Sequence, residues 1–289
     1  MTWGDTGQVR ELVPAAPVPA LRPFVGWYIG YRQSGMPPGL HRGLPSPYLT
    51  MIITLDEPLQ LAAHPDDRRP PRVYQTVLGG LHSTPAIIRH QGRQSGVQIG
   101  LKPLGARVLL GLPAGELAAL DTDAGDVLGP VATELQDRIR GAPTWGRRFA
   151  VVDEVLLRLF RDDQEVSREV ARAWQVLLAT GGTVAVPELA SEAGWSSRQL
   201  GTRFRTEIGL TPKEAARVVR FDRARRLLQR RVAACQPAGL AALAADCGYY
   251  DQAHLAREFR LLAGLAPSRW LGEEFRNVQV QPPPPEEQW

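Results

Sequence analysis

The stretch LASEAGWSSRQLGTRFRTEIGLTP, residues 189–212, decides the fold of the C-terminal third of the chain, because it recurs as LAADCGYYDQAHLAREFRLLAGLAP at residues 243–267. In both copies Leu-Ala is followed by a glycine with an aromatic neighbour, and then by leucine, phenylalanine, glycine and proline. The spacing is the same, except that the second copy has one more residue between its first glycine and the leucine. Agreement at this many positions indicates a duplicated structural unit.

The first copy predicts a helix, a tight turn and a second helix. Gly194 can end the first helix because glycine tolerates positive φ, and Ser196 with Gln199 three residues later has the pattern of a capping box. Leu200 and Phe204 then fall on one face at helical spacing, so we expect them to be buried.

The second copy predicts the same arrangement with different residues. Residues 238–246 form its first helix, Gly248 makes the turn, and Asp251 caps the second helix. Leu255 and Phe259 lie on the buried face of that helix.

A long helix from Pro212 to about Arg230 is expected between the two copies. Its buried stripe would consist of Val218, Phe221, Ala224 and Leu228, with arginines at positions 217, 220, 223, 225, 226 and 230 elsewhere on its surface. At 1.5 Å per residue this helix is roughly 27 Å long. It can therefore hold the second helices of the two copies, which in a helix-turn-helix are the ones that enter the DNA major groove, about one turn of the DNA duplex, roughly 34 Å, apart.

Positive charge is concentrated in the same region. The whole chain has a formal charge of only +4, yet the segment from Arg198 to Arg231 contains 11 basic residues and only three acidic ones. Such a density attracts a polyanion and releases its counterions. A solvated arginine-rich surface is the alternative, and the duplicated helix pair favours DNA over it.

The segment from about Ala185 to Arg276 resembles the DNA-binding domain of the AraC/XylS family of bacterial regulators. The residues that carry the resemblance are Leu189-Ala190, Gly194, Leu200, Phe204-Arg205, Gly209-Leu-Thr-Pro212, Arg220-Phe221, Ala224, Leu227-Leu228, Gly248-Tyr249, Asp251-Gln252, Leu255, Arg257, Phe259-Arg260, Gly264-Leu-Ala-Pro267 and Trp270. The resemblance implies seven helices, two of them in the major groove of double-stranded DNA, and regulation of transcription initiation. Residues 21–105 resemble, more weakly, the N-terminal domain of one subset of these regulators.

Candidate DNA contacts follow from these helices. Arg198 is the best candidate for reading a base, since arginine can bond guanine O6 and N7 together, whereas Arg203 and Arg205 are expected to hold phosphates. Gln252 could read adenine. The full candidate set is Ser196, Ser197, Arg198, Gln199, Thr202, Arg203, Arg205, Arg220, Asp251, Gln252, His254, Arg257 and Arg260. Gly201 and Thr202 depart from the family, in which an arginine is commoner there, so fewer base contacts are expected from the middle of that helix.

The first half of the chain is expected to be rich in β-structure. Short β-branched runs at 48–55, 73–78 and 96–101 stop at turn residues, which is typical of a sandwich or a cupin-like barrel. Helical spacing follows, with Leu128, Val131, Leu135 and Ile139 on one stripe and Val151, Val155 and Leu159 on another. We therefore predict an α+β protein with three parts: a β-rich sensor or dimerisation domain with trailing helices (1–162), a tandem helix-turn-helix domain (163–276) and a disordered Pro-rich tail (277–289).

Other expectations concern partners, location and chemistry. The chain lacks a signal-peptide core and any long apolar run, which favours a cytoplasmic, nucleoid-associated protein with no membrane partner. RNA polymerase, a small-molecule effector of the N-terminal domain and a second copy of the chain are candidate partners. Cys235 and Cys247 lack zinc or redox spacing, so no cofactor and no metal is expected.

Catalysis finds little support, because the nucleotide-binding, zinc-protease and nucleophile-elbow motifs are all missing from the sequence, and we expect no enzyme. One alternative is a metal-dependent barrel enzyme with an accessory DNA-binding module, in which His41, His64, His82 and His90 would gather around a metal. Another is an architectural DNA-binding protein without an effector. The tryptophans Trp174, Trp195 and Trp270 are expected to be core anchors.

Overall fold

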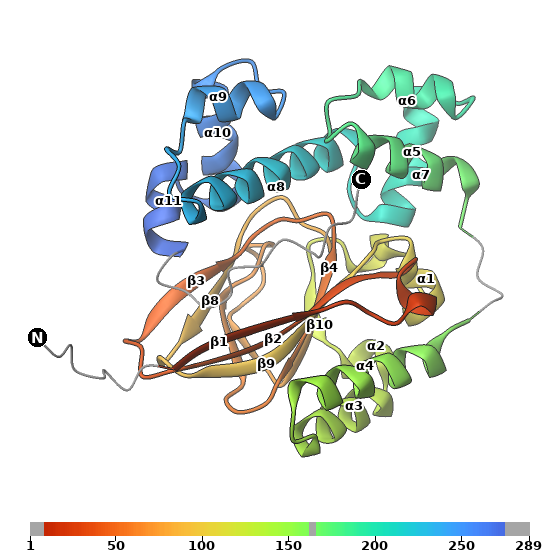
Figure 1. Cartoon of the computed structure of the whole chain (residues 1–289). Coiled ribbons are helices and arrows are strands. Elements are labelled where there is room, and N and C mark those ends of the chain that lie inside the picture. Colours follow the sequence, from red (N-terminus) through yellow and green to blue (C-terminus); the bar gives the residue numbers. More distant parts are fainter. Residues whose placement is uncertain (1–8, 162–165, 275–289) are drawn as a thin grey trace, which may run out of the picture.

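The structure is a computed structural model that describes residues 9–161 and 166–274 (Figure 1). The elements of the N-terminal part are β1 Val9–Ala15, η1 Pro19–Leu21, β2 Val25–Ser34, β3 Gly39–Gly43, β4 Leu49–Thr54, β5 Leu59–Ala63, β6 Arg72–Tyr74, β7 Thr76–Gly79, β8 Ala86–His90, β9 Gln94–Leu101, α1 Gly105–Leu110, η2 Ala114–Leu117, β10 Asp121–Asp123, α2 Gly125–Leu128, α3 Pro130–Gly141 and α4 Trp145–Leu159. The C-terminal elements are α5 Arg168–Ala179, α6 Val186–Glu192, α7 Ser197–Ile208, α8 Pro212–Ala233, α9 Leu240–Asp246, α10 Gln252–Ala263 and α11 Pro267–Glu274. The expected Pro-rich tail, 277–289, lies outside the described residues.

Two antiparallel sheets form the N-terminal part, which agrees with the β-rich domain that the short β-branched runs predicted. One has the order β1-β2-β9-β4-β7-β10 and the other β3-β8-β5-β6. Because side chains alternate along a strand, Met51 and Ile53 of β4 pack toward the trailing helices, while Ile52 between them packs between the sheets. The α+β fold class is confirmed.

The trailing helices α3 and α4 cover the outer face of the six-stranded sheet. Both predicted stripes, 128–139 and 151–159, belong to the apolar core that this face shares with the helices. Phe149 of α4 stacks on Tyr28 of β2 with ring centroids 6.0 Å apart, and the Tyr28 hydroxyl donates to Asp153 Oδ1 at 2.9 Å. These contacts anchor the helix pair to the sheet.

One predicted strand is divided. The run 73–78 was expected to be a single strand, but β6 belongs to the four-stranded sheet and β7 to the six-stranded sheet. The chain changes sheets at Gln75, whose backbone oxygen accepts from the Thr54 backbone N at 3.0 Å. The β-branched composition is the same on both sides of this corner, so the sequence shows no break.

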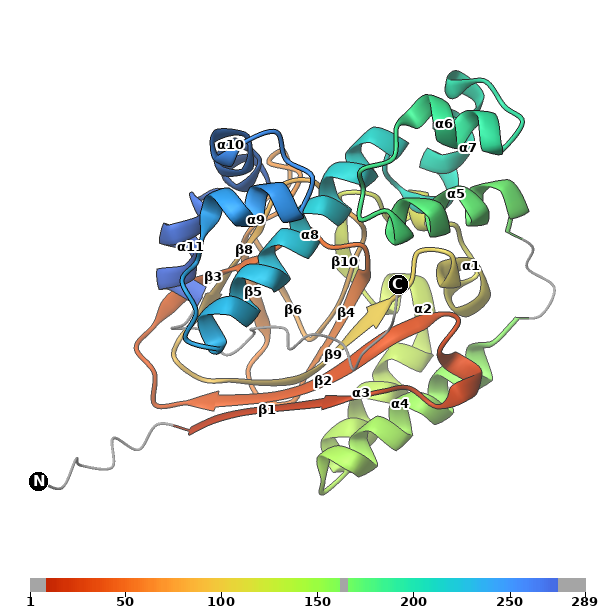
Figure 2. The same ribbon diagram turned by 45° about the horizontal axis from the view of Figure 1, so that its top comes forward.

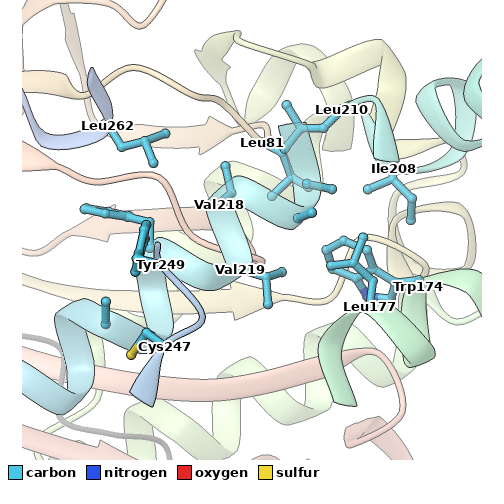
Figure 3. Close-up of a cluster of buried hydrophobic side chains, with 14 of the residues drawn as sticks. Leu81, Trp174, Leu177, Ile208, Leu210, Val218, Val219, Cys247, Tyr249 and Leu262 are labelled. Carbon is cyan, nitrogen blue, oxygen red and sulfur yellow. The ribbon is translucent and has the colours of Figure 1, made fainter. Parts of the chain in front are cut away.

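The C-terminal part contains the seven helices that the family resemblance implied, α5–α11. Its core is a single apolar cluster, part of which Figure 3 shows with Trp174 labelled. Trp174 and Trp270 are both buried in it, as predicted. Trp195 packs only at the edge of this cluster and is partly exposed. Aromatic contacts extend through the second unit, where Phe259 lies 4.9 Å from Phe221 and 5.7 Å from Trp270 between ring centroids.

Helix α8 runs between the two helical units, with α6 and α7 near one end and α9 and α10 near the other (Figures 1 and 2). Its other side faces the β-sheets. Leu81, from the turn after β7, is buried in the same cluster as Leu210, so the apolar core of the helical part includes a residue of the β-rich part (Figure 3). The two parts of the chain are therefore packed together. In the described segments, none of the helices combines the length and apolar character needed to cross a membrane.

Candidate DNA-binding interface

Helix α7 begins at the N-cap residue that the sequence predicted, with one of the two bonds of the expected capping box. The Ser196 side chain accepts a hydrogen bond from the Gln199 backbone N at 3.2 Å, which satisfies one of the free N–H groups of the first turn. A complete capping box, in which the side chain three residues later also bonds the backbone N of the capping residue, is formed at the start of the next helix, α8, by Thr211 and Glu214. Gly209 ends α7 at a φ of +96°, a conformation that favours glycine.

Helix α10 begins with a different cap. Asp251 accepts from the backbone N of His254 at 2.6 Å, and the Tyr250 backbone N donates to His254 Nδ1 at 3.3 Å. The edge of the His254 ring meets the Tyr249 ring, with centroids 5.3 Å apart. The loop before α10 and the first turn of that helix therefore hold each other in place.

The candidate side chains of α7 lie on its outer face, whereas Leu200, Phe204 and Ile208 are fully buried. The exposed set is Ser196, Ser197, Arg198, Gln199, Thr202, Arg203 and Arg205. Arg203 lies over the Trp195 ring at 5.0 Å, and Arg205 reaches Glu214 at 3.4 Å. Within the described residues, the Arg198 guanidinium has no hydrogen-bond or ion-pair partner.

Helix α10 presents a second polar surface. Asp251, Gln252, Arg257 and Arg260 are exposed, and His254 is partly exposed. In the part of the chain that the structure describes, the guanidinium groups of Arg257 and Arg260 are also without a partner. Both recognition helices therefore offer hydrogen-bond donors and positive charge that the fold does not use.

Arg220 on α8 differs from the other candidates because the fold uses its guanidinium. The group donates to the backbone oxygen of Gly182 at 3.1 Å and to that of Gly248 at 3.4 Å, and it lies 5.5 Å from the centre of the Tyr249 ring. Arg220 thus ties together loops of both helical units, a role that the sequence pattern did not indicate.

Two further arginines of α8 are buried, although the sequence placed them off the buried stripe. Arg225 and Arg226 are 3% and 9% exposed, and both pair with Asp222, at 2.5 Å and 2.7 Å. Buried charges of this kind are stable when paired and hydrogen-bonded. The spacing of Asp222 from these arginines, three and four residues, is the one sequence signal that could have indicated the pairing.

The last turn of α7 is covered by the N-terminal part. Arg107 of α1 forms two hydrogen bonds with the Glu207 carboxylate, at 2.7 and 2.8 Å. Gly115 of η2 lies so close that an added Cβ would stand 2.2 Å from the Thr206 backbone oxygen. The N-terminal part therefore covers one side of the last turn of α7, while Arg205 in that turn stays exposed.

Comparison with known families agrees with this geometry. Residues 189–273 match the model of a helix-turn-helix domain, and residues 14–123 match that of a domain of unknown function (DUF6597). The first match spans both helix-turn-helix units and is of the AraC type. Residues 189–273 therefore form an AraC-type helix-turn-helix domain, and the protein is a DNA-binding transcription regulator.

Solved structures show that the regulator shares a fold with ToxT from Vibrio cholerae, at a TM-score of 0.52 and 11% identity over 85% of this chain and 97% of that one. A ToxT structure with a bound unsaturated fatty acid gives a TM-score of 0.47 at 10% identity, covering 94% and 97% of the two chains. The AraC-like transcriptional activator CuxR gives 0.26 at 15% identity, covering 76% and 86%. No curated protein sequence matches significantly.

The regulator also contains a cavity of about 80 Å³ between its two sheets and α8. Apolar residues such as Ile52 and Ile88 line it together with the polar side chains of His41, Gln98 and Arg225. Asp121, also in the lining, is buried, and this burial raises the pKa of its carboxyl to about 6.

The four histidines of the β-rich part are distributed over several elements. His41 lies on β3 and His90 on β8, while His64 Nδ1 is 3.4 Å from Asp121 Oδ2. Throughout residues 9–161 and 166–274, no group of three or more His, Cys, Asp or Glu side chains is arranged to hold a metal ion. No observation of the site therefore favours the metal-enzyme alternative.

Proposed function

We propose that the regulator recognises specific DNA sequences by placing α7 and α10 in two successive major grooves. The observation that carries the proposal is that two capped helices of one repeat each have a buried apolar face and an exposed face of arginine, glutamine and small polar residues. A helix fits the major groove, and side chains of these types are the ones that bond base edges and phosphates.

In this proposal Arg198, Gln199 and Gln252 contact base edges, and Arg257 and His254 contact bases or phosphates. Arg203, Arg205 and Arg260 hold phosphates and so fix the position of each helix on the duplex. The remaining candidates for DNA contact are Ser196, Ser197, Thr202, Asp251 and Arg220. Of these, Ser196 and Asp251 also cap the two helices, and Arg220 also ties together loops of both units.

We also propose that the β-rich domain, residues 1–162, modulates the tandem helix-turn-helix domain, residues 163–276, when a small molecule occupies the cavity. The support is that Arg225, which lines the cavity, belongs to the helix that connects the two DNA-binding units. An occupant that contacts Arg225 would favour one position of α8 over another, and hence one arrangement of α7 and α10. RNA polymerase and a second copy of the chain are further partners in the proposal.

A selection experiment followed by a salt series tests sequence recognition. The full-length protein is used to select duplexes from a random pool, and binding of the selected duplex and of a scrambled one is then measured at several salt concentrations. We expect the selected duplex to bind about 10³-fold or more tightly, with both affinities falling as salt rises.

The outcomes separate the parts of the proposal. Equal binding of both duplexes at every salt concentration would exclude sequence-specific recognition, and binding of neither would refute the proposed use of α7 and α10. Thermal-shift screens of small molecules test the effector, because a ligand of the folded state raises Tm in a concentration-dependent way. Melting curves that stay unchanged across a broad screen would favour a regulator without an effector.

A further inference from the structure

The two helix-turn-helix units differ at one place, the turn before the second helix. From Gly194 to Leu200 there are six positions, and from Gly248 to Leu255 there are seven. The second turn thus has one additional residue and contains two adjacent tyrosines, Tyr249 and Tyr250.

These two tyrosines have opposite environments. Tyr249 is 5% exposed and packs in the core, whereas Tyr250 is 92% exposed, and the next most exposed large apolar side chain in the described residues, Leu261, is 59% exposed. In the same part of the chain, Tyr250 takes part in no ring contact and its hydroxyl has no partner. The fold therefore does not use the Tyr250 side chain.

The backbone of Tyr250 is nevertheless fixed. Its N–H donates to His254 Nδ1, and the next residue, Asp251, caps the first turn of α10. The exposed phenol consequently stands at the N-terminal end of α10, two residues before the candidate contact Gln252. An aromatic side chain in this position loses little conformational entropy when it binds, because only two side-chain torsions must be fixed.

The charge at this end of the helix indicates which DNA group the phenol suits. A helix N-terminus attracts phosphate, but here the Asp251 carboxylate occupies the cap and repels it. A neutral hydroxyl donor that reaches past the carboxylate can bond a phosphate oxygen without adding a charge, and its ring can rest on the adjoining sugar.

We propose that Tyr250 is a DNA-contact residue, whose hydroxyl donates to a backbone phosphate beside the groove that α10 enters. This inference rests on the proposed function. It adds a neutral contact to the second unit that has no counterpart in the first, because the first turn lacks the additional residue.

Tyr250→Phe in the full-length protein tests the hydroxyl, and Tyr250→Ala tests the ring as well. On the duplex that the wild type selects, we expect Phe to weaken binding about tenfold, equivalent to about 1.4 kcal/mol, and Ala to weaken it at least as much. The slope of log affinity against log salt should not change, because tyrosine releases no counterion, whereas Arg260→Ala, which removes a proposed phosphate contact, should reduce it by about 1. Val73→Ala, which also trims a well-exposed apolar side chain but in the β-rich domain, is the control and should bind as the wild type does.

A duplex in which single phosphates are replaced by neutral methylphosphonates locates the contact. For one phosphate of the second half-site, the loss caused by Tyr250→Phe should disappear, because its partner is already missing. Wild-type affinity of the Phe variant, or additive losses at every phosphate tested, would overturn the Tyr250 contact while leaving the proposed function intact. If the wild type selects no sequence, both the proposed function and this contact fail.

Discussion

Arg198 is the residue whose environment best fits direct reading of a base. It is exposed in the first turn of α7, and its guanidinium is unpartnered within the described part of the chain. We expect Arg198→Ala to relax the sequence preference at one base pair and to weaken specific binding by about 1–3 kcal/mol. Selection from a random pool with the variant and the wild type measures both effects.

Arg205→Ala is the matched comparison for this prediction. Arg205 is exposed on the same helix but about two turns closer to its C-terminal end, where it pairs with Glu214. Because Arg205 is proposed to hold a phosphate, Arg205→Ala should weaken the binding of all duplexes to a similar extent. A uniform loss with Arg198→Ala as well would reassign Arg198 to the DNA backbone.

His41 makes the stability of the β-rich domain sensitive to acid. Burial, together with the nearby His90 and Arg42, lowers the pKa of His41 from 6.5 to about 3. The unfolded chain takes up a proton at this position as the pH falls through 6.5, but the folded protein does so only near pH 3. Stability is therefore fully present above pH 6.5 and is lost as the pH decreases toward 3.

We expect this single group to reduce the free energy of unfolding by about 2 kcal/mol between pH 7 and pH 5. His41→Gln removes the titration, so the difference in unfolding free energy between the two pH values should be smaller by that amount. Urea unfolding at both pH values measures it. Parallel pH dependence in the variant and the wild type would show that His41 does not contribute.

At the level of single elements, helix α7 contains an unusual glycine. Gly201 lies inside the helix, and an added Cβ there would meet no atom within 4 Å. We expect Gly201→Ala to raise the free energy of unfolding by about 0.5–1 kcal/mol, because alanine loses less conformational entropy in a helix.

Gly194→Ala is the control for this substitution. Its Cβ would also enter open space, but Gly194 has a φ of +68°, a conformation that L-residues rarely adopt. It should therefore destabilise the protein by about 1 kcal/mol. The midpoints of urea unfolding of both variants measure these changes in stability. A change of the same sign and size in the two variants would contradict this account of the α7 backbone.

The helical elements could be predicted from sequence because their determinants are local. Ser196 and Asp251 cap the residues directly after them, and the stripes through Phe204 and Phe259 repeat at helical spacing. The change of sheet at Gln75 could not be predicted, because it depends on pairing with residues distant in the sequence.

The same distinction applies to the candidate site. The exposure of Arg198 and Arg257 follows from their position on a helix whose opposite face is apolar. The burial of Arg225 and the use of Arg220 as a tie between loops depend on how distant segments pack together. The spacing of residues along the chain does not reveal that packing.

At the level of the whole molecule, the ion pair between Arg107 and Glu207 connects the β-rich domain to a recognition helix. The side chains are 25% and 14% exposed, and the geometry is bidentate, so the pair is stronger than an open surface pair. Glu207→Gln leaves a partly buried guanidinium without its counter-charge. We expect faster amide hydrogen exchange in both α1 and α7, and a loss of about 1–2 kcal/mol of stability.

Glu192→Gln gives the comparison, because its partner Arg172 and Glu192 itself are 64% and 42% exposed. That pair should contribute close to zero to the stability of the fold, as most exposed ion pairs do. Exchange rates of α7 that are identical in the two variants would show that Arg107 does not restrain the helix.

The difference between the two helix-turn-helix units has a consequence for promoters. Since α7 and α10 carry different side chains and occur once each in a fixed order along the chain, the site bound by one molecule under the proposed function has no twofold symmetry. Such a site has a defined direction, so inverting it in the DNA would reverse the orientation of the bound protein relative to the start of the gene. The orientation of the site, and not only its distance from that start, then belongs to the regulatory signal.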